Sequence, residues 1–253
     1  MPQSLPDAGK INPSHPMFEL IEAAYGVFDC NTPADLDVCT QKCCMEAEVA
    51  ADFFKHQIRD LPFDYLRQWH SAAYSSEGVA KDIWTYLLPR TLESLASGKE
   101  PNSLGLELSL RRFDTGNRRE WSEAQWSALD SFQRTFLAGG FIAENVWGDH
   151  QNLDDVLCMF RLGGWTLEPL FDQIMSMPLE GIATRLHRHW CCETFGSIWQ
   201  SAFWEKSDKQ IVHQFYTSTT LRERMESLAL SSDHPPVLTD RAAAVFDVMD
   251  TAG

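Results

Sequence analysis

The stretch Ser122–Gly140, SEAQWSALDSFQRTFLAGG, carries the clearest signal for the fold. Ser122 and Gln125 have the spacing of a capping box, in which each side chain bonds the backbone N–H of the other residue at a helix start. Apolar side chains then follow at helical intervals, at Trp126, Leu129, Phe132 and Phe136. The pair Gly139-Gly140 is expected to end the helix, because glycine is a common helix stop.

The same helical spacing recurs along most of the chain, without a fixed repeat period. It predicts helices near residues 18–28, 44–58, 62–73, 79–97, 152–163, 166–177, 179–190, 219–229 and 239–249, with another beginning at Ser207. Only residues 103–113 are ambiguous, since their alternating leucines fit a strand as well as a short helix. We therefore expect an all-α fold of about a dozen short helices packed as antiparallel hairpins, in a globular array or a short superhelix.

The first 13 residues are rich in proline and polar side chains, and we expect a flexible tail there. Residues 14–253 are predicted to form a single helical domain. If the domain has two parts, residues 145–152 are the expected boundary.

Pro89 interrupts the 79–97 pattern, because its ring removes one helical N–H and clashes with the preceding turn. The segment is predicted to be a helix pair or one helix kinked at Pro89, ended by Gly98. Two interpretations of the neighbouring residues stay open. They are a surface ion pair beside a structural kink, or a binding groove lined by Trp84, Tyr86, Arg90 and Glu93.

The composition limits the function classes. A formal net charge of −15 disfavours nucleic acid as a partner, because phosphate backbones bind basic surfaces. No apolar run approaches the about 18 residues that a membrane span needs. The beginning of the chain lacks the features of a signal peptide, and the seven cysteines are odd in number. We expect reduced thiols, a cytoplasmic location and no membrane association.

Three further motifs are Cys39-Thr-Gln-Lys-Cys43-Cys44, the run from Asp82 to Glu93 containing Leu88-Pro89-Arg90-Thr-Leu-Glu93, and Leu110-Arg-Arg-Phe113 followed by Trp121-Ser-Glu123. Together they resemble a family of uncharacterised bacterial helical proteins. The family has a Cys-Thr-x-Cys-Cys element, so this chain carries one extra residue between Cys39 and Cys43. The resemblance covers about residues 18–137 and implies an all-helical fold and a bacterial origin, but no reaction.

Two cysteine clusters are the candidate metal or thiol sites. Cys39, Cys43 and Cys44 lack the Cys-x-x-Cys spacing of a structural zinc site. His187 and Cys191 are four residues apart, which on an α-helix places both on one face as half of a metal site. The alternative is that both clusters are helix residues without a ligand. We predict no bound cofactor.

No phosphate-binding glycine loop, cysteine-enzyme signature or Glu-x-x-His pair is present in the sequence. These absences favour a non-catalytic protein. The sequence therefore predicts a protein-binding module whose partner has a basic surface, because the strong negative charge would steer such a partner toward it. The alternative is a metal-binding or thiol-redox protein that uses the cysteine clusters.

Overall fold

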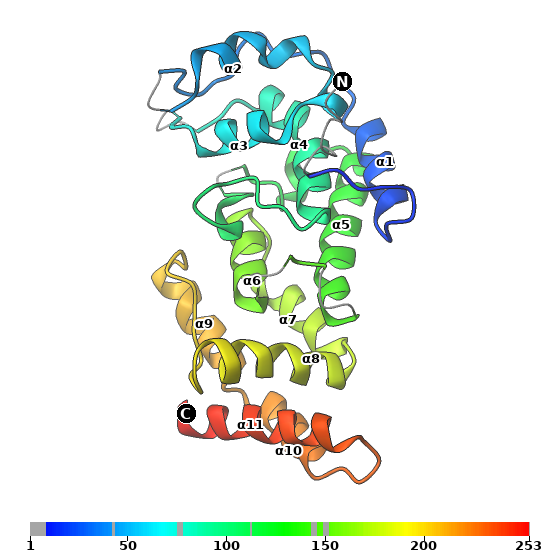
Figure 1. Ribbon diagram of the computed structural model, residues 1–253, viewed down its shortest axis with the longest axis vertical. Helices are drawn as coiled ribbons and strands as arrows, with labels where there is room; N and C mark the ends of the chain where they lie inside the picture. The colour runs from blue at the N-terminus through cyan, green and yellow to red at the C-terminus, as the bar shows by residue number, and fades with distance from the viewer. Residues whose placement is uncertain are drawn as a thin grey trace, which may run out of the picture. The chain divides into compact units, whose positions relative to one another are not determined.

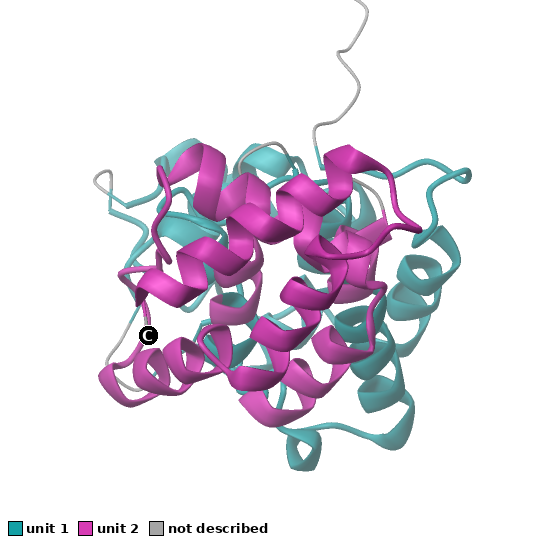
Figure 2. Ribbon diagram, turned by 90° about the horizontal axis from the view of Figure 1, so that it is seen from below, with its two compact units in different colours: residues 1–136, 145–150, 159–165 teal, residues 137–144, 151–158, 166–253 magenta. Residues whose placement is uncertain are grey.

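The computed structural model describes residues 9–41, 44–74, 78–111, 113–142, 146–148 and 152–252. Within these ranges every regular element is helical (Figure 1), which confirms the predicted all-α fold class. The chain divides into two compact units, coloured separately in Figure 2. Unit 1 comprises residues 1–136, 145–150 and 159–165, and unit 2 comprises the remaining residues.

The helices of unit 1 come from the first part of the chain. They are α1 (Phe18–Val27), α2 (Ala47–Asp52), α3 (Phe63–Ser71) and α4 (Lys81–Ala96), with the short 3-10 turns η1 (Phe53–Lys55), η2 (Ile58–Asp60), η3 (Leu106–Leu108) and η4 (Arg118–Glu120). Two helices, α5 (Glu123–Ile142) and α6 (Leu153–Leu162), begin in one unit and end in the other.

α4 is the buried helix of unit 1. Every residue from Tyr86 to Ala96 is buried, including Pro89, which lies inside an unbroken helix. The predicted alternative of two separate helices is therefore wrong. Pro89 forfeits one ladder hydrogen bond, but the stability of a helix covered on all sides comes mainly from packing. Gly98 follows with φ of +76°, and its N–H bonds the carbonyl of Leu95 at 2.9 Å, as predicted for a left-handed cap.

The capping box at the start of α5 is confirmed. The Ser122 N–H donates to Gln125 Oε1 at 3.1 Å, and the Gln125 N–H donates to Ser122 Oγ at 3.3 Å. The end of α5 differs from the prediction, because the helix continues through Gly139 and Gly140 to Ile142. Glycine lowers helix stability by about 1 kcal/mol per residue without preventing the conformation, and the Gly140 carbonyl accepts a hydrogen bond from buried Arg185.

Two residues of the expected flexible tail, Gly9 and Ile11, form hydrogen bonds with side chains of α4. The Gly9 carbonyl accepts a hydrogen bond from Arg90, and the Ile11 N–H donates to Glu93 Oε1 at 3.4 Å. The first eight residues of the predicted tail lie outside the described residues. At 103–113 the described residues form η3 and turns in place of the expected helix or strand, with Leu104 70% exposed.

Unit 2 contains α7 (Leu167–Ser176), α8 (Leu179–Leu186), the π-helix η5 (His187–Glu193), α9 (Lys206–Tyr216), α10 (Thr219–Ala229) and α11 (Pro236–Ala252). α10 and α11 pack side by side, as expected for a helical hairpin (Figure 1). Buried Asp154 fixes the loop before α9, since its Oδ2 accepts from the Ser201 N–H at 2.6 Å and from Trp204 Nε1 at 2.9 Å.

Candidate functional site: an acid-edged apolar pocket in unit 1

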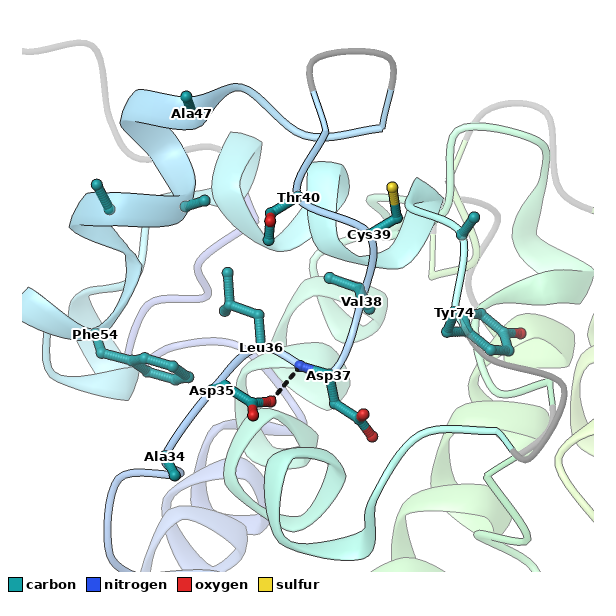
Figure 3. A pocket seen from close by; sticks show the side chains of 13 residues that line it. Ala34, Asp35, Leu36, Asp37, Val38, Cys39, Thr40, Ala47, Phe54 and Tyr74 are labelled. Carbon is teal, nitrogen blue, oxygen red and sulfur yellow. Dashed lines mark hydrogen bonds between the residues drawn. The ribbon is translucent and has the colours of Figure 1, made fainter.

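A pocket of unit 1 has a volume of about 890 Å³ (Figure 3). It is open to solvent and is lined by the loop 34–40, by α2 with the turn after it, and by the residues that follow α3. Its lining residues are Ala34, Asp35, Leu36, Asp37, Val38, Cys39, Thr40, Ala47, Ala50, Ala51, Phe54, Ala73 and Tyr74. A volume of this size is within the range of ligand-binding pockets in proteins.

Hydrogen bonds from outside the loop hold residues 34–40 in place. The indole Nε1 of buried Trp69, on α3, donates to the Leu36 carbonyl at 2.9 Å. The Cys39 N–H donates to the Ala73 carbonyl at 2.6 Å. These bonds tie both halves of the loop to α3 and its C-terminal extension, so the pocket wall is a fixed surface rather than a free loop.

The loop turns at Asp37, which adopts the left-handed conformation with φ of +51°. The turn is closed by Asp35, whose Oδ1 accepts a hydrogen bond from the Asp37 N–H at 2.8 Å, drawn as a dashed line in Figure 3. Aspartate tolerates this conformation better than most residues and forms such side-chain turns readily. The Asp37 carboxylate in turn accepts a hydrogen bond from the Ala80 N–H. The turn therefore places two carboxylates along one edge of the pocket.

The opposite wall is apolar and made of small side chains. Ala47, Ala50 and Ala51 are spaced three and four residues apart, so they share one face of α2. Phe54 follows in η1, and its ring packs edge-on against Tyr86 of α4 with the centroids 5.9 Å apart. Alanine fills little volume, which leaves the cavity open between α2 and the acidic loop.

The pocket combines an apolar wall with an acidic edge. The alanine and phenylalanine wall can receive an apolar group, because removing apolar surface from water is favourable by about 25 cal/mol per Å². The carboxylates of Asp35 and Asp37 can pair with a neighbouring lysine or arginine.

The first predicted cysteine cluster contributes one residue to this pocket. Cys39 lines the cavity and is half-buried, and Cys44 is half-buried in the turn before α2. Cys43 lies outside the described residues. Among the described residues, no group of three or more His, Cys, Asp and Glu side chains is placed to hold a metal ion.

The second cluster lies in unit 2 and has a different geometry from the one predicted. His187 and Cys191 were expected four residues apart on an α-helix, but residues 187–193 form a π-helix. The π-helix has a five-residue hydrogen-bond repeat. His187 Nδ1 consequently lies 3.8 Å from the Sγ of Cys192, the residue after Cys191.

The ionisable groups of the π-helix differ in environment. Burial, and then the positive charge of Arg241, lower the pKa of His187. Burial raises the pKa of Cys191, with smaller contributions from Cys192 and Asp247. Cys192 itself is exposed.

The four residues of the predicted groove are buried in unit 1. Trp84 is 2% exposed and stacks on Phe113, with the ring centroids 3.7 Å apart. Tyr86 is 6% exposed, and its hydroxyl lies 3.4 Å from the His56 carbonyl. These side chains are covered by the core of unit 1, so the structure offers no open groove between them.

Arg90 and Glu93 do form an ion pair, but it is buried. Arg90 has no exposed surface, and its Nη1 lies 3.2 Å from Glu93 Oε2. Arg90 Nε donates to the Leu61 carbonyl at 3.0 Å, and the same Glu93 oxygen accepts from the Tyr25 hydroxyl at 2.8 Å. Burial and the Glu93 carboxylate raise the pKa of Tyr25. Arg90 thus joins α1, α4 and the segment before α3, which is a structural role.

Sequence reasoning missed the pocket loop, although two signals for it are present. Pro33-Ala-Asp35-Leu-Asp37 has the residue types of a side-chain-closed turn. The alanines at 47, 50 and 51 mark a helix face without bulky side chains. Neither signal shows that the two elements face one another, because that depends on the Trp69 and Ala73 contacts.

Comparison of the chain with models of protein families, with curated proteins and with solved structures found no match. The resemblance to a bacterial helical family therefore stays a prediction. No helix in the described part of the chain is long and apolar enough to cross a membrane.

Proposed function

We propose that this protein is a non-catalytic binding module of the cytoplasm, and that its unit 1 pocket receives an apolar side chain next to a lysine or arginine of a partner protein. The observation that carries the proposal is the cavity of about 890 Å³ with alanines and Phe54 on one side and the carboxylates of Asp35 and Asp37 on the other. The net charge of −15 supports a partner with a basic surface, since opposite charge speeds association.

The cytoplasmic part of the proposal is supported by the thiols. Cys30, Cys39, Cys191 and Cys192 form no disulfides, and Cys30 and Cys192 are exposed. Exposed thiols without disulfide partners are typical of proteins in a reducing compartment.

A peptide-display selection tests the proposal. Random peptides are selected on the intact protein and counter-selected on the Ala51→Trp variant, whose indole would occupy the cavity beside α2. We expect the enriched peptides to combine a lysine or arginine with a neighbouring large apolar residue. Selection of acidic peptides, or of peptides that bind the Ala51→Trp variant equally well, would contradict the proposal.

Charge variants then locate the binding edge. Asparagine retains the turn geometry and hydrogen-bond acceptor of aspartate, so Asp35→Asn with Asp37→Asn removes two charges with little change to the loop. We expect about a tenfold loss of affinity for the selected peptide, measured by calorimetry. The matched control is Glu48→Gln with Asp64→Asn, which removes two exposed charges outside the pocket lining. An equal loss in the control would show that only net charge matters.

The alternative function, a metal-binding or thiol-redox protein, has one specific observation in its favour. It is the contact between His187 and Cys192 in unit 2. This contact belongs to a separate surface, and it is independent of the unit 1 pocket.

A further inference from the structure

The π-helix at residues 187–193 brings side chains five residues apart onto one face. Two contacts show this register. His187 Nδ1 lies 3.8 Å from Cys192 Sγ, and Arg188 Nε lies 3.2 Å from Glu193 Oε1. π-helical turns are rare and occur frequently at functional sites. In an α-helix the partner of His187 would have been Cys191.

The distance between the two donor atoms fits a shared metal ion. Metal–sulfur bonds are about 2.3 Å and metal–nitrogen bonds about 2.0–2.1 Å for zinc, a first-row ion of similar size to Cu(I). A sulfur and a nitrogen on one ion are therefore about 3.5 Å apart at a tetrahedral angle and at most about 4.4 Å apart on a straight line. The observed separation of 3.8 Å lies between these limits, and a near-linear two-coordinate Cu(I) would require the two side chains to move about 0.6 Å further apart.

The number of donors and the local charge select the kind of ion. No third His, Cys, Asp or Glu joins the pair in the described residues, which makes a closed four-ligand zinc site unsuitable. Cu(I) accepts two ligands and prefers thiolate sulfur and imidazole nitrogen. The charged groups that act on this face are Arg241, the Arg188–Glu193 pair and Asp247, which acts on Cys191. The positive Arg241 disfavours a divalent ion more than a monovalent one.

We propose that His187 and Cys192 form a two-donor site for a monovalent soft cation, with Cu(I) as its ligand. On binding, the Cys192 thiol releases its proton to water and its sulfur forms the bond to copper, while the neutral imidazole of His187 donates its Nδ1 lone pair. The metal keeps its oxidation state, and the thiolate cancels its charge. Cys192 is exposed, so a copper donor can reach it.

Copper competition under anaerobic, reducing conditions tests the site. The intact protein in a Cys30→Ser background, which removes another exposed thiol, is titrated against a chromogenic Cu(I) chelator. We expect Cys192→Ser and His187→Gln each to lower the Cu(I) affinity at least tenfold. Cys191→Ser is the matched control, because it removes the adjacent thiol without touching the pair, and we expect less than a twofold change.

Two further measurements keep the test decisive if a variant folds poorly. Loading wild-type protein with Cu(I) should shift the ring resonances of His187 and leave those of His213 unchanged. Arg241→Gln should raise the affinity several-fold, because it removes the positive charge beside His187. The proposal is overturned if Cys191→Ser weakens binding as much as Cys192→Ser, if His187→Gln has no effect, or if the His187 resonances do not move.

Discussion

At the scale of single residues, Arg90 has the clearest structural role. Its guanidinium is fully buried and donates to Leu61, Gly9 and Glu93. Removing one partner of a buried, hydrogen-bonded ion pair leaves the other charge without compensation, which costs about 3–5 kcal/mol. We therefore expect Arg90→Ala to lower the free energy of unfolding by about that amount, measured by urea denaturation.

Arg118→Ala is the control for this prediction. Arg118 Nη2 lies 2.8 Å from Glu123 Oε2, but both side chains are largely exposed. Exposed ion pairs contribute about 0–1 kcal/mol, so the stability should hardly change. A small effect of Arg90→Ala, comparable to that of Arg118→Ala, would contradict the structural role and reopen the hypothesis that Arg90 contacts a partner.

Sequence spacing indicated that Arg90 and Glu93 pair, but it did not indicate whether the pair is buried. The three-residue spacing of Arg90 and Glu93 correctly indicated an ion pair, but burial depends on α1 and on the segment before α3, which are distant in sequence. His187 and Cys191 were considered as a half-site on an α-helical spacing, whereas the structure places His187 Nδ1 beside Cys192. A spacing rule assumes the α-helical repeat, and no feature of His-Arg-His-Trp-Cys-Cys indicates the wider π-helical turn.

At the scale of helices, the start of α5 offers a quantitative test. Ser122 accepts a hydrogen bond from the Gln125 N–H and is exposed. Replacing a serine N-cap with alanine costs about 1 kcal/mol, because an N–H at the helix start loses its partner. We expect Ser122→Ala to reduce the free energy of unfolding by about 1 kcal/mol in urea denaturation. Ser127→Ala, at an exposed position inside α5, should leave it unchanged or slightly higher. Equal effects of the two substitutions would disprove the cap.

Some local features were predicted better than helix interruptions. The capping box, the cap at Gly98 and the helix around Leu221 are local features, and the structure contains all three. Gly139-Gly140 was expected to end a helix and does not, and the helix pair that was one alternative at Pro89 is a single helix. Local propensity costs a few kcal/mol at most, and burial of the surrounding surface can offset that amount.

At the scale of the whole molecule, composition and periodicity were enough to predict the all-α fold class. They were not enough to predict the candidate site. The pocket requires loop 34–40 to face α2, and that arrangement depends on hydrogen bonds from Trp69 and to Ala73. Such contacts join residues more than thirty positions apart, which a single sequence without aligned relatives does not reveal.

Two buried histidines in the described part of the chain, His70 and His189, affect the stability of the protein in acid. Burial lowers the pKa of His70, in unit 1, to about 3 and that of His189, in unit 2, to about 4. Both values lie below the about 6.5 of an unfolded chain, so only the unfolded state takes up these protons as the pH falls below 6.5. The contribution of these two neutral histidines to the free energy of unfolding is fully present above pH 6.5 and is lost progressively toward pH 3–4.

We therefore expect the free energy of unfolding to depend on pH between 7.5 and 5.5, by about 1.4 kcal/mol for each buried histidine. Protonation of exposed histidines acts in the opposite direction, because it reduces the net charge of −15 and its self-repulsion.

Comparison with variants separates the two effects. In urea denaturation at both pH values, His70→Gln and His189→Gln should each lose part of the acid destabilisation, since glutamine cannot take up the proton. His213→Gln, at a partly exposed position on α9, is the control and should keep the wild-type loss. The prediction is contradicted if His70→Gln and His189→Gln lose as much free energy of unfolding between pH 7.5 and 5.5 as His213→Gln does. Protonation of the two buried rings would then not cause the acid destabilisation.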